Sequence, residues 1–335
     1  MAGQKSKDVL IRTDLKEMMS ELDFAELNLQ VDNIAPPIFT KKREGRYPVM
    51  PRETRAKIPD TRRSPGGTYQ RGEWEWKDDW YTSEEYGYEE TVDQISALEN
   101  EEFVDEELVA SELSLEKLLL ARESRVATEL LDDSKVWTGS KNIITLDNAD
   151  RWYDNAAEAK IFNVIEQAAN IIRSKCIFGK SMLTLTITDD MLGEIFKSAE
   201  IKDDTKYTIY LQTLGQQAKA QWLRDYLGIK EVKIVSGIFD TAGLGAEFEA
   251  ARFWSNNYAL LGKLSDGKSN SLMNRNVARQ IVWTKHSRDY LLESYSEKKT
   301  NRFVYRASEY RGLKINTDYG ILIKGLKPSV DSKGL

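Results

Sequence analysis

The stretch YPVMPRETRAKIPDTRRSPGGTYQRGEWEW (residues 47–76) is basic in its first half and rich in tryptophan and acid in its second. Pro65-Gly66-Gly67 supplies turn chemistry between two segments, TRAKI and TYQRGEWEWKDDW, whose side chains alternate in type at period two. The pattern predicts a long hairpin over residues 46–82. A two-stranded hairpin alone in water is only marginally stable, so a hairpin of this length needs a surface to lie on.

Charge is distributed unevenly around this hairpin. Residues 41–63 hold nine Lys and Arg against three Asp and Glu, a net charge of +6, whereas residues 84–107 hold neither Lys nor Arg. Three functions fit such a segment: a nucleic-acid-binding finger, a disordered linker, or a hairpin that grips a neighbouring subunit. Carboxylates alternate with the tryptophans and would repel phosphate beside a stacked base, which weakens the first of these.

The composition of the whole chain limits the alternatives further. With 335 residues, 41% of them hydrophobic and 10% aromatic, the chain has the material for two cores and is too apolar for disorder. Its net charge of −6 gives no general attraction to nucleic acid or to acidic membranes. No stretch approaches the roughly 20 apolar residues of a membrane span, and the first residues lack the apolar segment of a signal peptide. We therefore expect an intracellular origin and no membrane partner.

Catalytic and metal-binding chemistry has little material in this sequence. Cys176 is the only cysteine and His286 the only histidine, which excludes internal disulfides and multi-cysteine zinc sites. Adjacent aspartates at 189–190 and 203–204 lack calcium-loop spacing and are better explained as a helix cap and a solvated turn. The motif FGKS (residues 178–181) lacks the first glycine of a phosphate-binding loop. We expect no catalytic, cofactor or metal site, and we predict that the protein is not an enzyme.

Helix patterns are clearest in the first half of the chain. Residues 1–45 are predicted to form an arm, because a short helix followed by the two prolines of NIAPPIFT suits a segment lying on another surface. Residues 101–132 give the strongest helix signal, with no Gly or Pro, a broad apolar stripe, and acids before bases. At 1.5 Å per residue this helix would be roughly 45 Å long, more than an ordinary globular domain needs.

The second half of the chain changes from α/β to mostly β. Residues 145–236 alternate helices and strands, and the helix LGQQAKAQWLRDYLG is predicted to end at Gly228. The segment GIFDTAGLGAEFEA (residues 237–250) has three glycines but no dinucleotide-binding pattern, so a loop after a strand is the simplest explanation. The segment LKINTDYGILIKGL (residues 313–326) is predicted to be the single final strand.

The order of these parts, with the opening stretch leading into EEYGYEETVD (residues 84–93), resembles the major capsid proteins of tailed double-stranded DNA bacteriophages. The resemblance covers most of the chain. It implies an α+β, Hong Kong 97-like capsid fold with an N-terminal arm (1–45), an extended loop made of the hairpin and an acidic connector (46–100), a peripheral domain (101–149 and 263–335) containing a spine helix (101–132), and an axial domain (150–262).

The resemblance also implies a function. Such a chain would be a structural protein that self-assembles into pentamers and hexamers of an icosahedral head, and would contact the packaged double-stranded DNA weakly and non-specifically. Scaffold, portal and decoration proteins are the implied partners, with assembly in the host bacterial cytoplasm and residence in the virion capsid. The alternatives are an encapsulin-type nanocompartment shell protein and an unrecognised α/β enzyme.

Two groups of residues are predicted to act in assembly. Single exposed ion pairs contribute only about 0–1 kcal/mol, but several engaged at once act together. The residues predicted to contact a neighbouring subunit are Arg52, Arg55, Arg62, Arg63, Trp74, Trp76, Glu84, Glu85, Glu89 and Glu90. The residues predicted to lie near the axis of a capsomer are Gly237, Asp240, Gly243 and Gly245.

Overall fold

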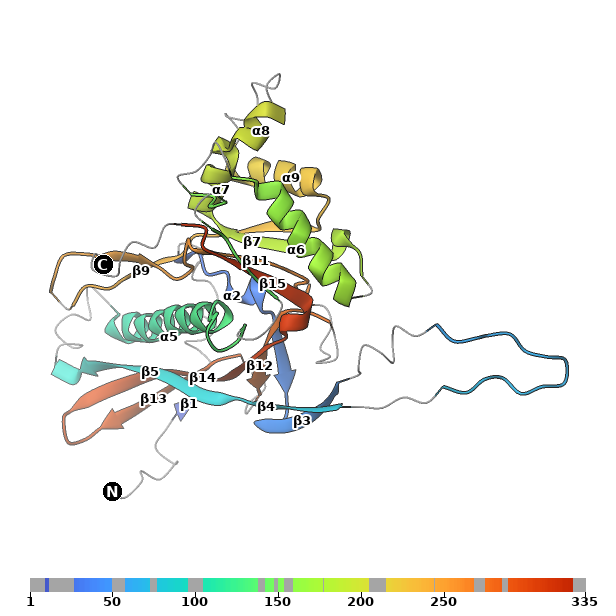
Figure 1. Ribbon diagram of the computed structural model, residues 1–335. Coiled ribbons are helices and arrows are strands. Elements are labelled where there is room, and N and C mark those ends of the chain that lie inside the picture. The colour runs from blue at the N-terminus through green and yellow to red at the C-terminus, as the bar shows by residue number, and fades with distance from the viewer. Residues whose placement is uncertain are drawn as a thin grey trace.

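A computed structural model of the chain describes residues 10–11, 27–49, 58–72, 77–95, 105–137, 142–147, 150–153, 159–176, 178–204, 215–243, 245–267, 275–284 and 289–327. These residues form two large β-sheets, helices packed against them, and a hairpin that projects from the body (Figure 1). No helix within the described ranges is long and apolar enough to cross a membrane.

The first sheet is built around the long strand β14 (Arg302–Ile315). β13 (Leu291–Glu297) and β5 (Glu84–Asp93) pair with the same residues of β14, so they flank it on opposite sides. β12 (Ala278–Trp283) continues beyond β13 along β14, since Arg311 pairs with both β12 and β5. Two short strands extend the sheet, β1 (Leu10–Ile11) beside β13 and β2 (Pro37–Thr40) beside β12.

The helix α5 (Glu106–Leu130) lies along one face of this sheet (Figure 1). The side chain of Asp105 accepts a hydrogen bond from the backbone N–H of Leu108 and so caps the first turn. Leu115 and Leu118 are buried against the sheet. The predicted helix is confirmed over residues 106–130, which span about 37 Å at 1.5 Å per residue. It ends two residues before the predicted end at 132, and residues 101–104 lie outside the described ranges.

The second sheet has the strand order β6-β15-β11-β7-β8, and the helices α6, α7, α8 and α9 share its core. Its buried apolar residues form the largest core together with α6 and α7. α9 ends at Gly228 as predicted, and Gly228 has the left-handed backbone conformation. The strands are β6 (Ile143–Thr145), β7 (Thr184–Thr188), β8 (Glu231–Val235), β11 (Tyr258–Gly262) and β15 (Gly320–Lys324), and the helices are α6 (Ile161–Lys175), α7 (Asp189–Lys197), α8 (Ala199–Asp204) and α9 (Gln216–Leu227).

The C-terminal prediction of a single strand is wrong. Residues up to Ile315 belong to β14 of the first sheet, and β15 begins at Gly320 in the second. Between them lies a 3-10 helix, Thr317–Tyr319, whose first turn is capped by the side chain of Asn316. The chain thus changes sheets within five residues. β6 and β15 fall within the residues predicted for the peripheral domain, yet they pair in the sheet of the α/β part.

Part of the expected arm, residues 31–38, enters the core. α2 (Val31–Ile34) packs against α5 and leads into β2, which pairs in parallel with β12. Ile34 and Ile38 are 0% and 1% exposed. The prediction that NIAPPIFT lies on another surface is therefore wrong, because the two adjacent prolines fit an edge strand while Ile34 before them and Ile38 after them are buried in the core.

Candidate functional site

The projecting hairpin leaves the body as two paired strands. β3 (Glu44–Val49) and β4 (Lys77–Thr82) pair antiparallel along their whole length and form a sheet of their own. The guanidinium of Arg46 lies 4.4 Å from the ring centroid of Trp80 on the opposite strand. The predicted hairpin over residues 46–82 is confirmed at this base.

The far end of the hairpin contains the predicted turn. The backbone N–H of Gly67 donates to the carbonyl oxygen of Ser64 at 2.9 Å. Gly66 has a φ of 80°, in the left-handed region that favours glycine. Figure 1 shows this segment far from the body of the molecule. The turn at Pro65-Gly66-Gly67 is therefore confirmed.

The tip exposes both basic and apolar side chains. Arg63 donates to the carbonyl oxygen of Gly67 at 2.7 Å, and its guanidinium lies 4.7 Å from the ring centroid of Tyr69. Arg62 is exposed, and Ile58 and Tyr69 are 97% and 72% exposed. The other four predicted contact residues of the hairpin lie outside the described ranges: Arg52, Arg55, Trp74 and Trp76.

The acidic stretch that follows the hairpin begins as a strand and, at its other described end, enters α5. The first ten of its residues form β5, which was predicted to belong to a connector. Within the described chain, β14 is the only strand that pairs with β5, so the backbone groups that alternate along the outer edge of β5 have no partner strand there.

The four acidic contact candidates lie along β5 and differ in their surroundings. Glu84 accepts a hydrogen bond from the hydroxyl of Tyr86 at 2.8 Å. Glu89 lies 3.4 Å from the guanidinium of Arg306. Glu85 is exposed and Glu90 is half-buried. The fold therefore brings all four acids to one strand, which lies far in space from the basic tip of the same chain (Figure 1).

The glycine-rich loop predicted for the capsomer axis forms a small hairpin. β9 (Ile238–Asp240) pairs antiparallel with β10 (Ala250–Arg252). The carboxylate of Asp240 accepts hydrogen bonds at 2.9 Å from the backbone N–H groups of Ala242 and Glu249, which lower its pKa. Gly245 has a φ of 83°. In Figure 1 this hairpin runs beside α5, and its position relative to a capsomer axis stays a prediction.

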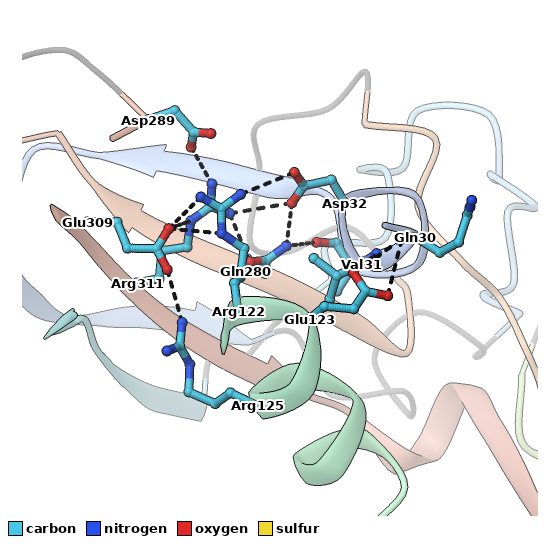
Figure 2. A network of polar contacts seen from close by, with 11 residues as sticks. Gln30, Val31, Asp32, Arg122, Glu123, Arg125, Gln280, Asp289, Glu309 and Arg311 are labelled. Atoms are coloured by element: carbon cyan, nitrogen blue, oxygen red, sulfur yellow. Dashed lines mark hydrogen bonds and ion pairs between the residues drawn. The ribbon is translucent and has the colours of Figure 1, made fainter. Parts of the chain in front are cut away.

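A buried ionic network joins α5 to the first sheet (Figure 2). Glu309 on β14 is 1% exposed, and its carboxylate faces three guanidiniums, those of Arg122 at 2.8 Å, Arg125 at 3.0 Å and Arg311 at 3.0 Å. Burial opposes the charge of Arg122, but Glu309 and two aspartates raise its pKa overall. Buried charges are costly unless each is paired, so the cluster favours one arrangement of the elements that carry it.

Asp32 extends this network to α2. Its carboxylate lies 3.5 Å from Arg122 and 3.4 Å from Arg311, and it accepts a hydrogen bond from the side-chain amide of Gln280 at 2.7 Å. Arg311 also pairs with Asp289. Segments near positions 30, 120, 280 and 310 therefore meet at one point, as Figure 2 shows.

Glu123 binds the backbone at the start of α2. Its buried carboxylate accepts hydrogen bonds from the N–H groups of Gln30 at 3.1 Å and Val31 at 2.9 Å, and from the indole of Trp254 at 2.7 Å. The two backbone groups are among the unpaired donors of a helix N-terminus. Burial raises the pKa of Glu123 in spite of these hydrogen bonds.

The sequence analysis missed this network, although one signal was present. Arg122 lies four residues after Leu118 and four before Val126, within the apolar stripe of α5. A charge at such a position must be paired on folding. Its partners could not be identified from the sequence because Glu309 is 187 residues away.

The motifs considered for catalysis have structural roles where they are described. Asp189 and Asp190 both pair with the guanidinium of Arg252, at 2.6 and 2.8 Å. The cap of α7 is the side chain of Thr188, not either aspartate, which corrects the prediction. No group of three His, Cys, Asp or Glu within the described ranges could hold a metal ion, and His286 lies outside those ranges.

Three solved structures share this architecture over most of its length. A phage-related protein from Bordetella bronchiseptica RB50 is 16% identical, with 95% of this chain and 98% of that chain covered and a TM-score of 0.68. The capsid of the native GTA particle is 11% identical, with 98% and 96% covered and a TM-score of 0.57. The bacteriophage PhiM1 mature capsid is 9% identical, with 87% and 84% covered and a TM-score of 0.50.

Sequence comparison adds no relative to these. No protein-family model matches the chain, and no curated protein matches it significantly. At 9–16% identity the likeness establishes the fold. The chain has the fold of phage capsid proteins, the α+β, Hong Kong 97-like architecture predicted from its sequence.

Proposed function

We propose that this chain is the major capsid protein of a tailed double-stranded DNA bacteriophage and self-assembles into the pentamers and hexamers of an icosahedral head. The observation that carries the proposal is the likeness to the GTA particle capsid over 98% of this chain. A likeness of that extent takes in both sheets, α5 and the hairpin. On this proposal the first sheet with α5 forms the peripheral domain and the second sheet with its helices forms the axial domain.

The projecting hairpin supports a role in assembly. Its tip carries exposed apolar and basic side chains, and it lies far from the body of the molecule (Figure 1). Covering exposed apolar side chains with another molecule is favourable, because it removes apolar surface from water. A shell of repeated subunits supplies that cover through head-to-tail contacts, which close into rings.

The assembly test is electron microscopy of the expressed chain, alone and with a scaffold protein encoded beside it. We expect shells, tubes or isolated capsomers, and a reconstruction of them would also locate Asp240 and its loop relative to the capsomer axis. Monomers in both preparations would overturn the proposal. Scaffold, portal and decoration partners, assembly in the host cytoplasm, and weak contact with packaged DNA all belong to the same proposal.

The contact that the hairpin makes is proposed to be with β5 of a neighbouring subunit. β4 passes through Ser83 directly into β5, so the hairpin of one chain points away from its own β5 (Figure 1). The acids of β5 would repel one another if two β5 edges paired. A basic tip from another copy is the complementary partner, and exposed ion pairs of this kind act together when several engage.

Charge reversal tests this contact. The variant with Arg62→Glu and Arg63→Glu should lose assembly while keeping its unfolding midpoint, because both side chains are exposed at the tip. Adding Glu85→Arg and Glu90→Arg to it should restore particles. The control is Lys299→Glu, an exposed reversal in the turn between β13 and β14. Normal particles from the double reversal would show that the tip does not make this contact.

A further inference from the structure

The hairpin meets the body at a joint with little freedom. Ser83, between β4 and β5, is fully buried. Its N–H donates to the carbonyl oxygen of Arg43 at 2.9 Å, its carbonyl oxygen accepts from the guanidinium of Arg43 at 3.1 Å, and its hydroxyl donates to the carbonyl oxygen of Ile281 at 3.1 Å. Every polar group of Ser83 is therefore bound, and both limbs of the hairpin are tied at this residue.

The backbone of β14 passes close beneath the end of β4. A Cβ atom added to Gly312 would lie 2.0 Å from the carbonyl oxygen of Thr82. Such an approach leaves no room for any residue but glycine. Because Gly312 is paired within the first sheet, the end of the hairpin rests directly on that sheet.

A second polar contact lies further along β4 toward the tip and joins one face of the hairpin to the first sheet. The carboxylate of Asp79 on β4 lies 2.7 Å from the ammonium of Lys314 on β14 and accepts a hydrogen bond from the hydroxyl of Tyr47 on β3 at 2.8 Å. Tyr47 is 8% exposed, so the contact is sheltered on one side. Burial acts against the charge of Asp79, but its hydrogen bonds to Lys314 and Tyr47 lower its pKa overall.

These contacts have a mechanical consequence because the hairpin is long. The tip lies well beyond β3 and β4, so a small rotation at the joint moves it a large distance across a neighbouring subunit (Figure 1). The neighbouring ion pair Arg46–Asp78 differs, since its two side chains lie 3.5 Å apart on the two strands of the hairpin and are 61% and 56% exposed.

We propose that Asp79, Lys314 and Tyr47, acting with Ser83, form a clamp that sets the direction in which the hairpin projects and thereby the curvature between adjacent subunits. The part concerning curvature rests on the proposed function. The part concerning direction is a property of the single chain. The three side chains of the clamp are positioning residues, since they hold the hairpin and leave the contact with the neighbour to its tip.

The direction of the hairpin is tested in the unassembled subunit by distances between two spin labels. In a Cys176→Ser background, labels are attached at Lys77→Cys on the outer end of β4 and at Lys299→Cys on the turn after β13, both exposed. We expect Asp79→Asn and Lys314→Met to broaden the distance distribution about twofold. Asp78→Asn, one residue along the strand, is the matched control and should leave it narrow.

The conservative variant Lys314→Arg keeps the charge and should keep the narrow distribution. Equal widths in wild type, Asp79→Asn and Lys314→Met would overturn the clamp. Equal broadening in Asp78→Asn would overturn it as well, because any loss of charge on β4 would then have the same effect.

The effect on curvature is tested by the diameters of assembled particles. Asp79→Asn and Lys314→Met should give a wider range of diameters or tubes, while Asp78→Asn gives wild-type particles. Broadened label distances with unchanged particle diameters would overturn the link to curvature. If wild type forms no particles, the proposed function fails, and the label distances still decide the clamp.

Discussion

The buried network at α5 and the exposed hairpin both pair arginines with carboxylates, but the two sets of ion pairs serve different purposes. Around Glu309 three arginines share one carboxylate out of reach of water, and 184 or more residues separate that carboxylate from two of them. On the hairpin, Arg46 and Asp78 have side chains 61% and 56% exposed and lie close together in the same small sheet. The first set holds the chain to itself, and the second is available to water and to other chains.

The difference follows from the cost of removing charge from water. A buried ion must keep its partners, since losing one leaves an uncompensated charge. An exposed ion loses little when a partner moves away, because water and salt replace it. The network therefore specifies one fold, whereas the surface of the hairpin can exchange one partner for another during assembly.

Removing the central carboxylate should have the largest effect. Glu309→Ala leaves Arg122 and Arg311 buried without their shared partner and should lower the free energy of unfolding by about 3–5 kcal/mol. Urea unfolding followed by circular dichroism measures this loss. The matched control is Glu89→Ala on the adjacent strand, where an exposed pair should cost about 0–1 kcal/mol. Equal losses of unfolding free energy in the two variants would show that the buried ion pairs are no more important for stability than the exposed ones.

A smaller effect is expected from Glu123→Gln, which keeps the shape of the side chain. The burial of Glu123 raises its pKa, so its stabilising contribution is complete below its ordinary value of 4.5 and is lost as the pH rises through the folded-state pKa. The free energy of unfolding of wild type should therefore exceed that of the variant by about 1–3 kcal/mol at low pH. This difference should shrink as the pH rises. Unfolding measured across pH checks this, and a gap that grows with pH would contradict it.

The smallest effect is expected on the hairpin itself. Arg46→Met removes the contact with Trp80 and the ion pair with Asp78, and should cost at most about 1 kcal/mol. Salt screens exposed charges, so this difference should fade at high ionic strength, while the loss caused by Glu309→Ala should persist. An effect of Arg46→Met that does not change with salt would show that the charges at the hairpin base are shielded from solvent, in contradiction to their exposure.

Local signals explain why part of the fold was predictable. The turn at Gly66, the end of α9 at Gly228 and the helix that follows Asp105 each depend on residues within one or two turns of the chain. The order of these elements was enough to indicate the capsid fold. The projecting tip was predictable for the same reason, since its turn residues and its charge are both read directly from the sequence.

Other features depend on residues far apart in sequence and were not predictable in the same way. The acids of residues 84–93 read as a solvated connector, but pairing with β14, more than 200 positions later, makes them a strand. The segment 313–326 read as one strand, but its two halves bury their apolar faces in different sheets. The alternation of residue types along the sequence indicates which side chains share a face of a strand. Which sheet that strand joins depends on the partner strand with which it pairs.

The sequence by itself determined the helices, the turns and the basic tip, because these depend on neighbouring residues. Only the tertiary structure decided that Arg122 of the apolar stripe would meet Glu309, that NIAPPIFT would fill a core, and that Gly312 would support the hairpin. The physical reason is the same in each case. Burial and charge pairing are set by which distant segments come together, and a single sequence does not contain those distances.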